Sequence, residues 1–160
     1  MSRAAAPPST DAEAAPRTAG VLLATSFYLR GALCALDTAI VEEVVRLRRT
    51  TAVPHAPAYV LGVMNLRGKI VSVIDLARKV ELGATEPGEE SRVYIVRERE
   101  ELVGLLVDRA ADVIELEADR LEPPPANVRG IEGRFFRGIG RAGGRLVAVL
   151  DPAAVLSNAK

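Results

Sequence analysis

The side chains that could carry out chemistry are few in this 160-residue sequence. The single histidine, His55, has no second His and no Asp or Glu at ligand spacing, and the single cysteine, Cys34, lies in an apolar run typical of a small core residue. The adjacent carboxylates of Glu42-Glu43 and of Glu89-Glu90 would point to opposite faces of a strand. The sequence therefore predicts no catalytic residue, no metal site and no cofactor.

A G-x-G-x-x-G pattern at Gly138, Gly140 and Gly143 suggests a nucleotide-binding enzyme at first sight. A dinucleotide site needs a helix that opens at the end of this pattern and an acidic residue ~20 positions later. Here an apolar strand-like run follows, and 17 residues remain after Gly143. We interpret these glycines as part of a hairpin.

One tetrapeptide could present a binding side chain. Asn65-Leu66-Arg67-Gly68 has Asn at the first and Gly at the fourth position, which is the preference of a type I turn. Arg67 would then project from a rigid tip, where a guanidinium can form paired hydrogen bonds with a carboxylate or carbonyl of a partner. A turn arginine can equally be only solvated, and spacing alone leaves both readings open.

Composition excludes several classes of protein. The 21 Lys and Arg balance the 21 Asp and Glu and aromatic residues make up 4%, so the chain lacks the basic excess and the stacking side chains of a nucleic-acid binder. No apolar run approaches the ~18 residues of a membrane span, and no signal peptide is recognisable. A single cysteine excludes an internal disulfide framework. These features predict a soluble cytoplasmic protein with no nucleic-acid partner and no direct membrane insertion.

The elements that must position any binding residue are mostly strands. Residues 1–19 are rich in Ala, Pro, Ser and Thr, and we expect a disordered tail there, followed by a folded region at 20–157. From residue 21 on, short apolar runs alternate with turn signals. Four hairpins are expected, with strands at 21–29 and 33–36, 60–64 and 69–74, 92–96 and 102–107, and 135–140 and 145–150.

Helices should be few and short. Asp75 can cap one or two turns that end by Gly83, and Asp151-Pro152 can open a helix that runs to about Ser157. One further turn is expected at residues 117–121. The run 40–45 has helical spacing but β-branched content, so the pattern alone allows a helix or a strand.

An internal repeat predicts the architecture. Residues 62–75 align without a gap on residues 138–151, and both copies contain an apolar strand, a tight turn, a basic residue, a second strand and an acidic helix cap. Each half of the folded region is large enough for one small barrel. We therefore expect two similar β-barrels packed side by side through an apolar interface.

The same residues resemble the CheW family of chemotaxis coupling proteins, which includes the regulatory domain of CheA histidine kinases. The signature-like run is residues 58–76, around Asn65-Leu66-Arg67-Gly68. Family-like segments occur in the family's order on both sides of it, at 27–45 with Val41-Glu42-Glu43-Val44, at Pro54 and Pro57, at 103–113, at 121–125 and at 138–150.

The resemblance implies an all-β fold of two intertwined five-stranded SH3-like barrels with one or two short helices. It implies approximate halves at 20–90 and 91–157, with strands that can cross between the barrels, and a strand at 40–45. The implied function is that of a non-enzymatic adaptor, located in the cytoplasm and recruited to membrane-associated receptor arrays. It would couple transmembrane chemoreceptors to a CheA-type kinase, or serve a non-flagellar pathway such as gliding, pilus motility or development.

The resemblance also implies the binding residues. The cytoplasmic tip of the receptor would dock at the turn formed by Asn65, Leu66, Arg67 and Gly68. Three further positions would contact the kinase or the receptor, without a division between the two partners: Val41, Glu43 and Gly62.

Overall fold

The computed structural model describes residues 20–157, and the tail predicted at 1–19 lies outside the described residues. The strands are β1 (Val21–Leu29), β2 (Ala32–Asp37), β3 (Val41–Val45), β4 (Val60–Leu66), β5 (Lys69–Asp75), β6 (Arg92–Glu98), β7 (Glu101–Val107), β8 (Arg109–Glu117), β9 (Asn127–Val128), β10 (Ile131–Glu132), β11 (Phe136–Ala142) and β12 (Arg145–Leu150). The helices are α1 (Leu76–Lys79) and α2 (Pro152–Leu156), with 3-10 turns η2 (Thr38–Ile40), η3 (Ala118–Arg120) and η4 (Gly133–Phe135).

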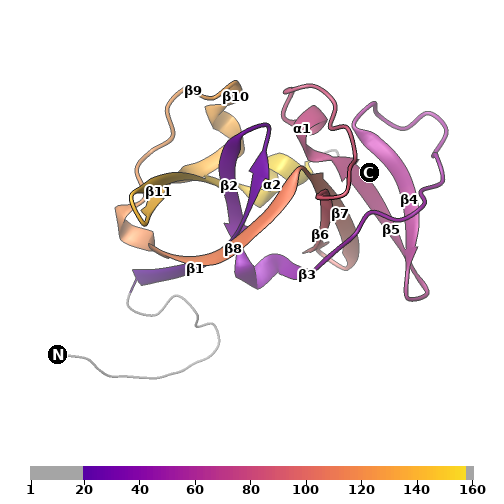
Figure 1. The fold of residues 1–160 in the computed structure, drawn as a ribbon, viewed down its shortest axis with the longest axis horizontal. Helices are drawn as coiled ribbons and strands as arrows, with labels where there is room; N and C mark the ends of the chain where they lie inside the picture. Colours follow the sequence, from indigo (N-terminus) through magenta and orange to yellow (C-terminus); the bar gives the residue numbers. More distant parts are fainter. Residues whose placement is uncertain (1–19, 158–160) are drawn as a thin grey trace.

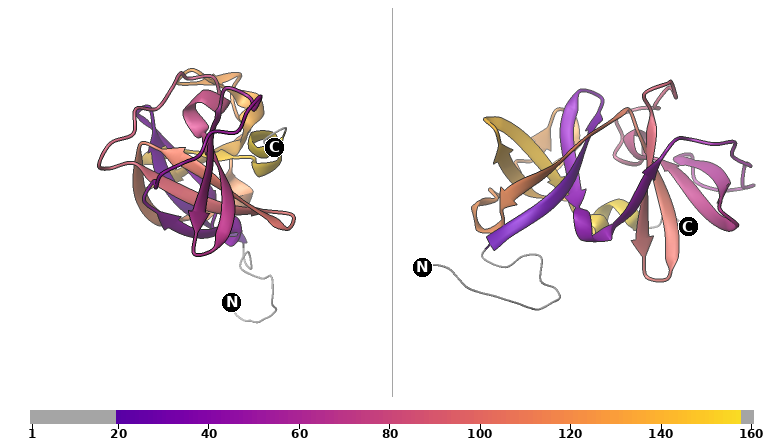
Figure 2. Two further views of the ribbon diagram at one scale, coloured as in Figure 1. Left: turned by 90° about the vertical axis from the view of Figure 1, so that its right-hand side faces the viewer. Right: turned by 60° about the horizontal axis from the view of Figure 1, so that its bottom comes forward.

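The strands form two five-stranded sheets and one two-stranded ribbon. The sheet of barrel 1 has the order β11-β12-β2-β1-β8, the sheet of barrel 2 has the order β3-β6-β7-β5-β4, and β9 pairs with β10. The two barrels lie side by side, with α2 between them (Figures 1 and 2). This arrangement confirms the predicted all-β fold of two SH3-like barrels.

The chain exchanges strands between the barrels. Residues 20–90 supply β1 and β2 to barrel 1 and β3, β4 and β5 to barrel 2. Residues 91–157 supply β6 and β7 to barrel 2 and β8, β11 and β12 to barrel 1. Each sequence half therefore spans both barrels, and neither half contains a complete sheet.

The strand registers show that the two barrels are structural copies. In barrel 2, β5 runs parallel to β7 with Ser72 opposite Val103, and in barrel 1, β12 runs parallel to β2 with Ala148 opposite Cys34. The β4–β5 hairpin has a register shift between Val60 and Gly62, and the β11–β12 hairpin has one at the equivalent residues 136 and 138. The repeat read from residues 62–75 and 138–151 thus extends to the hydrogen-bonded neighbours of each strand.

Most of the local predictions are confirmed. All four hairpins form where the turn signals placed them, and β3 occupies the ambiguous run as a strand. The Asp75 side chain accepts a hydrogen bond from the backbone N–H of Arg78 at the start of α1, and Asp151 does the same for Ala153 at the start of α2. The turn expected at 117–121 is η3. The strand β8 was not predicted as an element of its own.

The type I turn predicted at 65–68 is wrong. Leu66 and Lys69 are paired across the hairpin, so the loop contains two residues, Arg67 and Gly68. Their φ angles of 51° and 86° are both positive, as in a type I′ turn. This turn matches the right-handed twist of the flanking strands, whereas a type I turn would splay them.

Three apolar clusters hold the described fold together. One fills barrel 2 around Met64, Val71 and Val93, and one fills barrel 1 around Leu22 and Val147. The largest lies between the barrels and combines side chains of β1, β2, β6, β7, β12 and both helices. Burial of each large apolar side chain contributes roughly 1.5–3 kcal/mol to the free energy of unfolding, so the barrels stabilise each other. The predicted apolar interface is confirmed.

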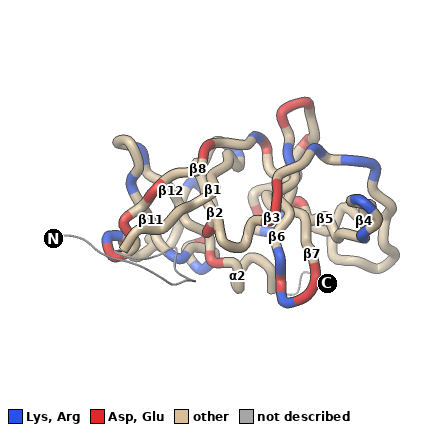
Figure 3. Tube along the Cα trace, turned by 90° about the horizontal axis from the view of Figure 1, so that it is seen from below, with Lys and Arg blue, Asp and Glu red and all other residues tan. Residues whose placement is uncertain are grey.

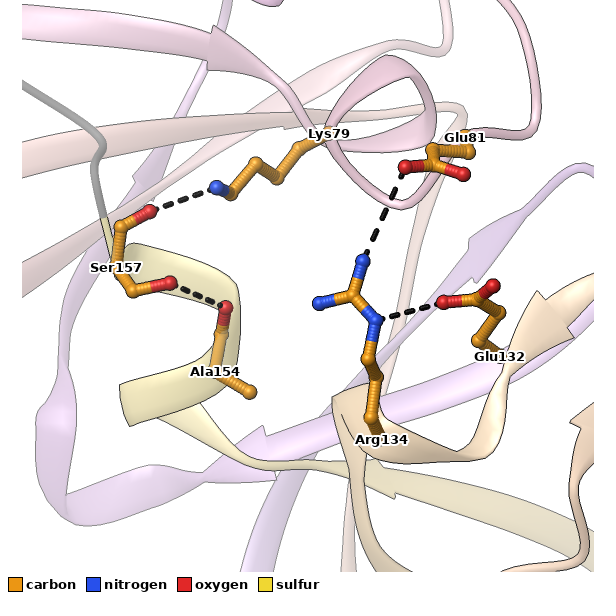
Figure 4. Close-up of polar contacts among 6 residues, drawn as sticks. All are labelled: Lys79, Glu81, Glu132, Arg134, Ala154 and Ser157. Atoms are coloured by element: carbon orange, nitrogen blue, oxygen red, sulfur yellow. Dashed lines mark hydrogen bonds and ion pairs between the residues drawn. The ribbon is translucent and has the colours of Figure 1, made fainter.

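Polar contacts also join the barrels. Tyr94 of barrel 2 donates its hydroxyl proton to the carbonyl oxygen of Ser26 of barrel 1 at 2.7 Å, and its ring meets that of Phe27 edge to face at 5.1 Å. On the helix side, Lys79 Nζ donates to the carbonyl oxygen of Ser157 at 2.7 Å (Figure 4). Arg134 Nε donates to Glu132 Oε1 at 2.6 Å, and its Nη2 lies 3.8 Å from Glu81 Oε2 (Figure 4).

Candidate functional site

Two of the predicted binding residues meet beside the tip of the β4–β5 hairpin in barrel 2. Arg67, at the tip of the β4–β5 hairpin, donates from Nη2 to the carboxylate of Glu43 on β3. Because β3 and β4 are the two edge strands of this sheet, the ion pair bridges the seam where the barrel closes. The side chain of Arg67 is 65% exposed and that of Glu43 is 32% exposed. Such an exposed pair contributes about 0–1 kcal/mol to stability, so its geometry matters more than its strength.

The local sequence fixes the direction of Arg67. The side-chain oxygen of Asn65 accepts the backbone N–H of Gly68 at 3.0 Å, which closes the tip. Gly68 has φ of 86° and nothing within 4 Å of the place where a Cβ would lie, so the turn requires glycine for its backbone angle rather than for space. Glu43 then holds one edge of the guanidinium and leaves the remaining N–H groups to solvent.

The other predicted residues occupy different environments. Leu66 is buried in the core of barrel 2, so its side chain supports the tip from below. Val41 is half-buried and packs against the cluster between the barrels, next to the seam. Gly62 is buried, and a Cβ built on it would lie 2.3 Å from the carbonyl oxygen of Thr51. The structure therefore brings Arg67 and Glu43 together, with Asn65 and Gly68 at the same tip.

A second ion pair lies beside this seam. Arg97 Nε, at the end of β6, donates to Glu42 Oε2 at 2.9 Å. The hydrogen bond from Arg97 and its positive charge lower the pKa of the Glu42 carboxyl, and the same contact raises the pKa of Arg97. Charges of both signs are interspersed along the chain (Figure 3).

The described part of the chain adds no candidate metal site. Over residues 20–157, no three His, Cys, Asp or Glu side chains come together as metal ligands. The G-x-G-x-x-G glycines lie in the β11–β12 hairpin, as interpreted from the sequence. Cys34 is fully buried, and its burial raises the pKa of the thiol to about 12. Among the described residues, no helix is long and apolar enough to cross a membrane.

The structure also contains a groove of about 580 Å³ on barrel 1, the barrel that does not carry the Arg67 tip. Sequence reasoning did not predict this groove. We call it the barrel 1 groove, and six of its lining residues are Tyr28, Leu33, Arg129, Arg141, Arg145 and Leu146. The signal was present in the repeat, because Arg145 and Leu146 align on Lys69 and Ile70. Without the register of β12 against β2, however, the sequence could not bring these residues next to Tyr28 and Leu33.

Comparison with known proteins identifies the family to which the chain belongs. The family model described as a CheW-like domain matches residues 24–160. A probable chemotaxis protein CheW of Rhizobium etli is 33% identical over 117 residues, which are 73% of this chain and 76% of the relative. The crystal structure of the scaffolding protein TtCheW from Thermoanaerobacter tengcongensis superposes with a TM-score of 0.73 at 33% identity, covering 81% of this chain and 84% of that chain. Protein FrzA of Myxococcus xanthus is similar more weakly, at 27% identity over 53% of each chain.

Proposed function

The chain belongs to the CheW-like family of chemotaxis coupling proteins, and from this premise we propose that it links the cytoplasmic tip of transmembrane chemoreceptors to the regulatory domain of a CheA-type histidine kinase. It would act as a non-enzymatic adaptor in the cytoplasm at membrane-associated receptor arrays. The weaker similarity to FrzA gives no reason to prefer a non-flagellar pathway.

The observation that carries the proposal is the exposed Arg67–Glu43 pair across the seam of barrel 2. The rigid two-residue tip limits the conformations of Arg67 before binding, which reduces the entropy lost when a partner is bound. Its free N–H groups can donate to carboxylates or to carbonyl oxygens at the end of a receptor helix. Glu43 and Val41 on β3 would extend the same surface for contact with the kinase or the receptor, and the buried Gly62 lies beneath it.

Coupling requires no bond to be made or broken. An adaptor that binds receptor and kinase at once changes kinase activity only when its binding free energy differs between the signalling states of the receptor. A rigid unit of two barrels can transmit such a difference, because the cluster between the barrels fixes their relative position. Individual contacts of modest area would gain avidity through assembly into arrays.

The test is calorimetric titration of the protein with the kinase regulatory domain and, separately, with a receptor fragment that contains the cytoplasmic tip. We expect Arg67→Glu to weaken receptor binding at least about tenfold, which is about 1.4 kcal/mol, while circular dichroism stays unchanged. Arg30→Glu is the matched control, since Arg30 occupies a tip with the same φ of 51° at the β1–β2 hairpin. Equal losses for both variants would count against a specific role of Arg67.

A charge exchange separates direct contact from indirect support. The double variant Arg67→Glu with Glu43→Arg keeps an ion pair across the seam but moves the guanidinium to β3. If Arg67 itself contacts the receptor, binding stays weak in this variant. Recovery of receptor binding would instead show that Arg67 acts indirectly, through its ion pair with Glu43 across the seam of the barrel.

A further inference from the structure

The segment between β3 and β4 carries a positive charge that the described fold leaves unopposed. Arg46, Arg48 and Arg49 are all exposed. Within residues 20–157, none of the three forms an ion pair or a side-chain hydrogen bond. The acidic side chains closest along the chain, Glu42 and Glu43, are each paired with another arginine. The three arginines are therefore available to a group outside this chain.

A free hydroxyl follows these arginines. Thr51 is exposed, and its Oγ1 has no hydrogen-bond partner in the part of the chain that the structure describes. Its backbone pairs with Val63 of β4, since Thr51 N donates to Val63 O at 2.8 Å and Val63 N donates to Thr51 O at 2.9 Å. Residues 46–50 belong to no helix or strand, and Leu47 packs against the barrel 2 cluster. The segment is thus anchored by one apolar side chain while its arginines stay exposed.

The spacing of the arginines points to the hydroxyl. They lie two, three and five residues before Thr51, and no other Ser or Thr of the sequence has arginine both two and three residues before it. Protein kinases select their substrates by charge patterns around the target residue. Carboxylates of an arginine-directed kinase can accept paired hydrogen bonds from such guanidinium groups. The neighbouring Thr50 is half-buried and has Leu47 three residues before it, so pattern and exposure coincide at Thr51.

Barrel 1 contains a carboxylate where barrel 2 has Thr51. Glu122 pairs with Ile139 of β11 through two backbone hydrogen bonds of 2.9 Å, as Thr51 pairs with Val63. The Glu122 side chain is exposed. Because the two barrels share this pairing, a negative group at the position of Thr51 is compatible with both backbone bonds.

The basic run has no counterpart in barrel 1. Counting back from the paired residues, Arg46 aligns on Glu117 and Arg48 aligns on Asp119. The charge is reversed at both positions, so the barrel architecture does not require arginine there. A contact outside the barrel accounts for these arginines better than folding does.

We propose that Thr51 is a phosphorylation site for an arginine-directed serine/threonine protein kinase. Thr51 Oγ1 attacks the γ-phosphorus of a nucleoside triphosphate, the bond from that phosphorus to the β–γ bridging oxygen breaks, and the nucleoside diphosphate leaves. The hydroxyl proton passes to a base of the kinase. The product carries about −1.5 to −2 charges, which supply the negative charge that this segment lacks. The modification does not depend on the proposed coupling function.

The test incubates the full chain with magnesium ATP and the catalytic subunit of cyclic-AMP-dependent protein kinase, an arginine-directed enzyme. We expect one phosphoryl group per chain, located at Thr51 by mass spectrometry of peptides. Absence of phosphate at Thr51, or phosphate spread over several hydroxyl groups, would overturn the proposal.

Matched variants test the hydroxyl and the arginines. Thr51→Val should abolish the incorporation, whereas Thr50→Val should keep at least about half of its rate. Arg48→Gln and Arg49→Gln should each slow it about tenfold, and Arg141→Gln, at an exposed arginine of β11, should change it less than about twofold. Equal rates for all three arginine variants would show that exposure alone selects Thr51, contrary to the proposal.

A stability measurement tests whether the fold accepts the phosphate. The phosphorylated chain and Thr51→Glu should both melt within about 3 °C of the unmodified chain, because Glu122 occupies the equivalent position in barrel 1. A fall of about 10 °C or more in both would show that barrel 2 does not accommodate a negative group there, and would count against a site in the folded protein.

Discussion

The two barrels share their strand registers but differ on their outer surfaces. Both contain the same parallel pairing, and the matching hairpins β4–β5 and β11–β12 have the same register shift near their start. Their outer grooves nevertheless differ in charge, with Glu100 and Glu101 in barrel 2 and Arg129 and Arg145 in barrel 1. Backbone hydrogen bonds and core packing keep the register, because a slip of one residue would turn buried side chains outward. Nothing in the fold constrains the exposed charges, so the surfaces are free to serve different partners.

The comparison extends to the segments that precede the β4–β5 and β11–β12 hairpins. Thr51 pairs with Val63 beside β4, and Glu122 pairs with Ile139 beside β11. In each barrel a glycine lies under this crossing segment, Gly62 in barrel 2 and Gly138 in barrel 1. The approach is closer in barrel 2, where a Cβ on Gly62 would be 2.3 Å from Thr51 O, than in barrel 1, where one on Gly138 would be 3.0 Å from Glu122 O.

The largest expected effect tests this difference. Gly62→Ala should lower the free energy of unfolding by about 3 kcal/mol, because the added Cβ collides with a backbone carbonyl that a rotamer change cannot move and because alanine rarely adopts the φ of 147° found at Gly62. Gly138→Ala should cost about 1 kcal/mol, since its nearest contacts require shifts of only a few tenths of an ångström. Urea unfolding of both variants measures the difference. Equal losses would show that the two crossings are equivalent in energy despite their geometry.

The next effect concerns the contact between the barrels. Tyr94 aligns on Thr25 of barrel 1, which bonds to Thr38 instead, so the hydrogen bond from Tyr94 to Ser26 has no counterpart. Tyr94→Phe should lower stability by about 1–2 kcal/mol, because it leaves the buried carbonyl oxygen without its donor. Tyr28→Phe removes a hydroxyl that accepts a solvent-exposed hydrogen bond from Arg145 and should change stability by less than about 0.5 kcal/mol. Thermal unfolding of the two variants would reveal how much the Tyr94 hydroxyl, which also forms a hydrogen bond with the backbone of Ala111, contributes to the interface.

The smallest effect comes from exchanging a core residue with its counterpart. Cys34 in barrel 1 occupies the position of Val103 in barrel 2, and both are buried. Cys34→Val should change stability by less than about 1 kcal/mol at neutral pH, because the volumes are similar. A loss of several kcal/mol would show that the two cores are not interchangeable at this position.

The same variant has a pH signature. Burial raises the pKa of the Cys34 thiol from 9.0 to about 12, so the folded state keeps a proton that the unfolded state loses. The contribution of the Cys34 thiol to the free energy of unfolding is therefore fully present below pH 9 and is lost as the pH rises toward 12. Cys34→Val should abolish that part of the alkaline fall, and urea titrations at pH 7 and pH 10 would detect it.

Sequence reasoning succeeded where the signal was local. The hairpins follow from apolar runs between turn residues, and Asp75 and Asp151 each cap a helix where the sequence predicted it. The turn type was missed because positive φ at Arg67 depends on the twist of the paired strands and not on the tetrapeptide alone. The strand β8 was missed because most of its side chains are exposed, so it lacks a clear alternating pattern.

The sequence by itself determined most of the strands and the helix caps, because these depend on residue types and spacings that are close along the chain. It also determined the duplication and the family, because these depend on residue motifs that can be aligned without a structure. Only the tertiary structure decided which barrel each strand joins, since exchange of strands leaves the local pattern unchanged. It also decided that Glu43 meets Arg67 across the seam and that Arg129 and Arg145 face one groove. Contacts of this kind join residues distant in sequence, and their geometry is fixed by the register and closure of the sheets.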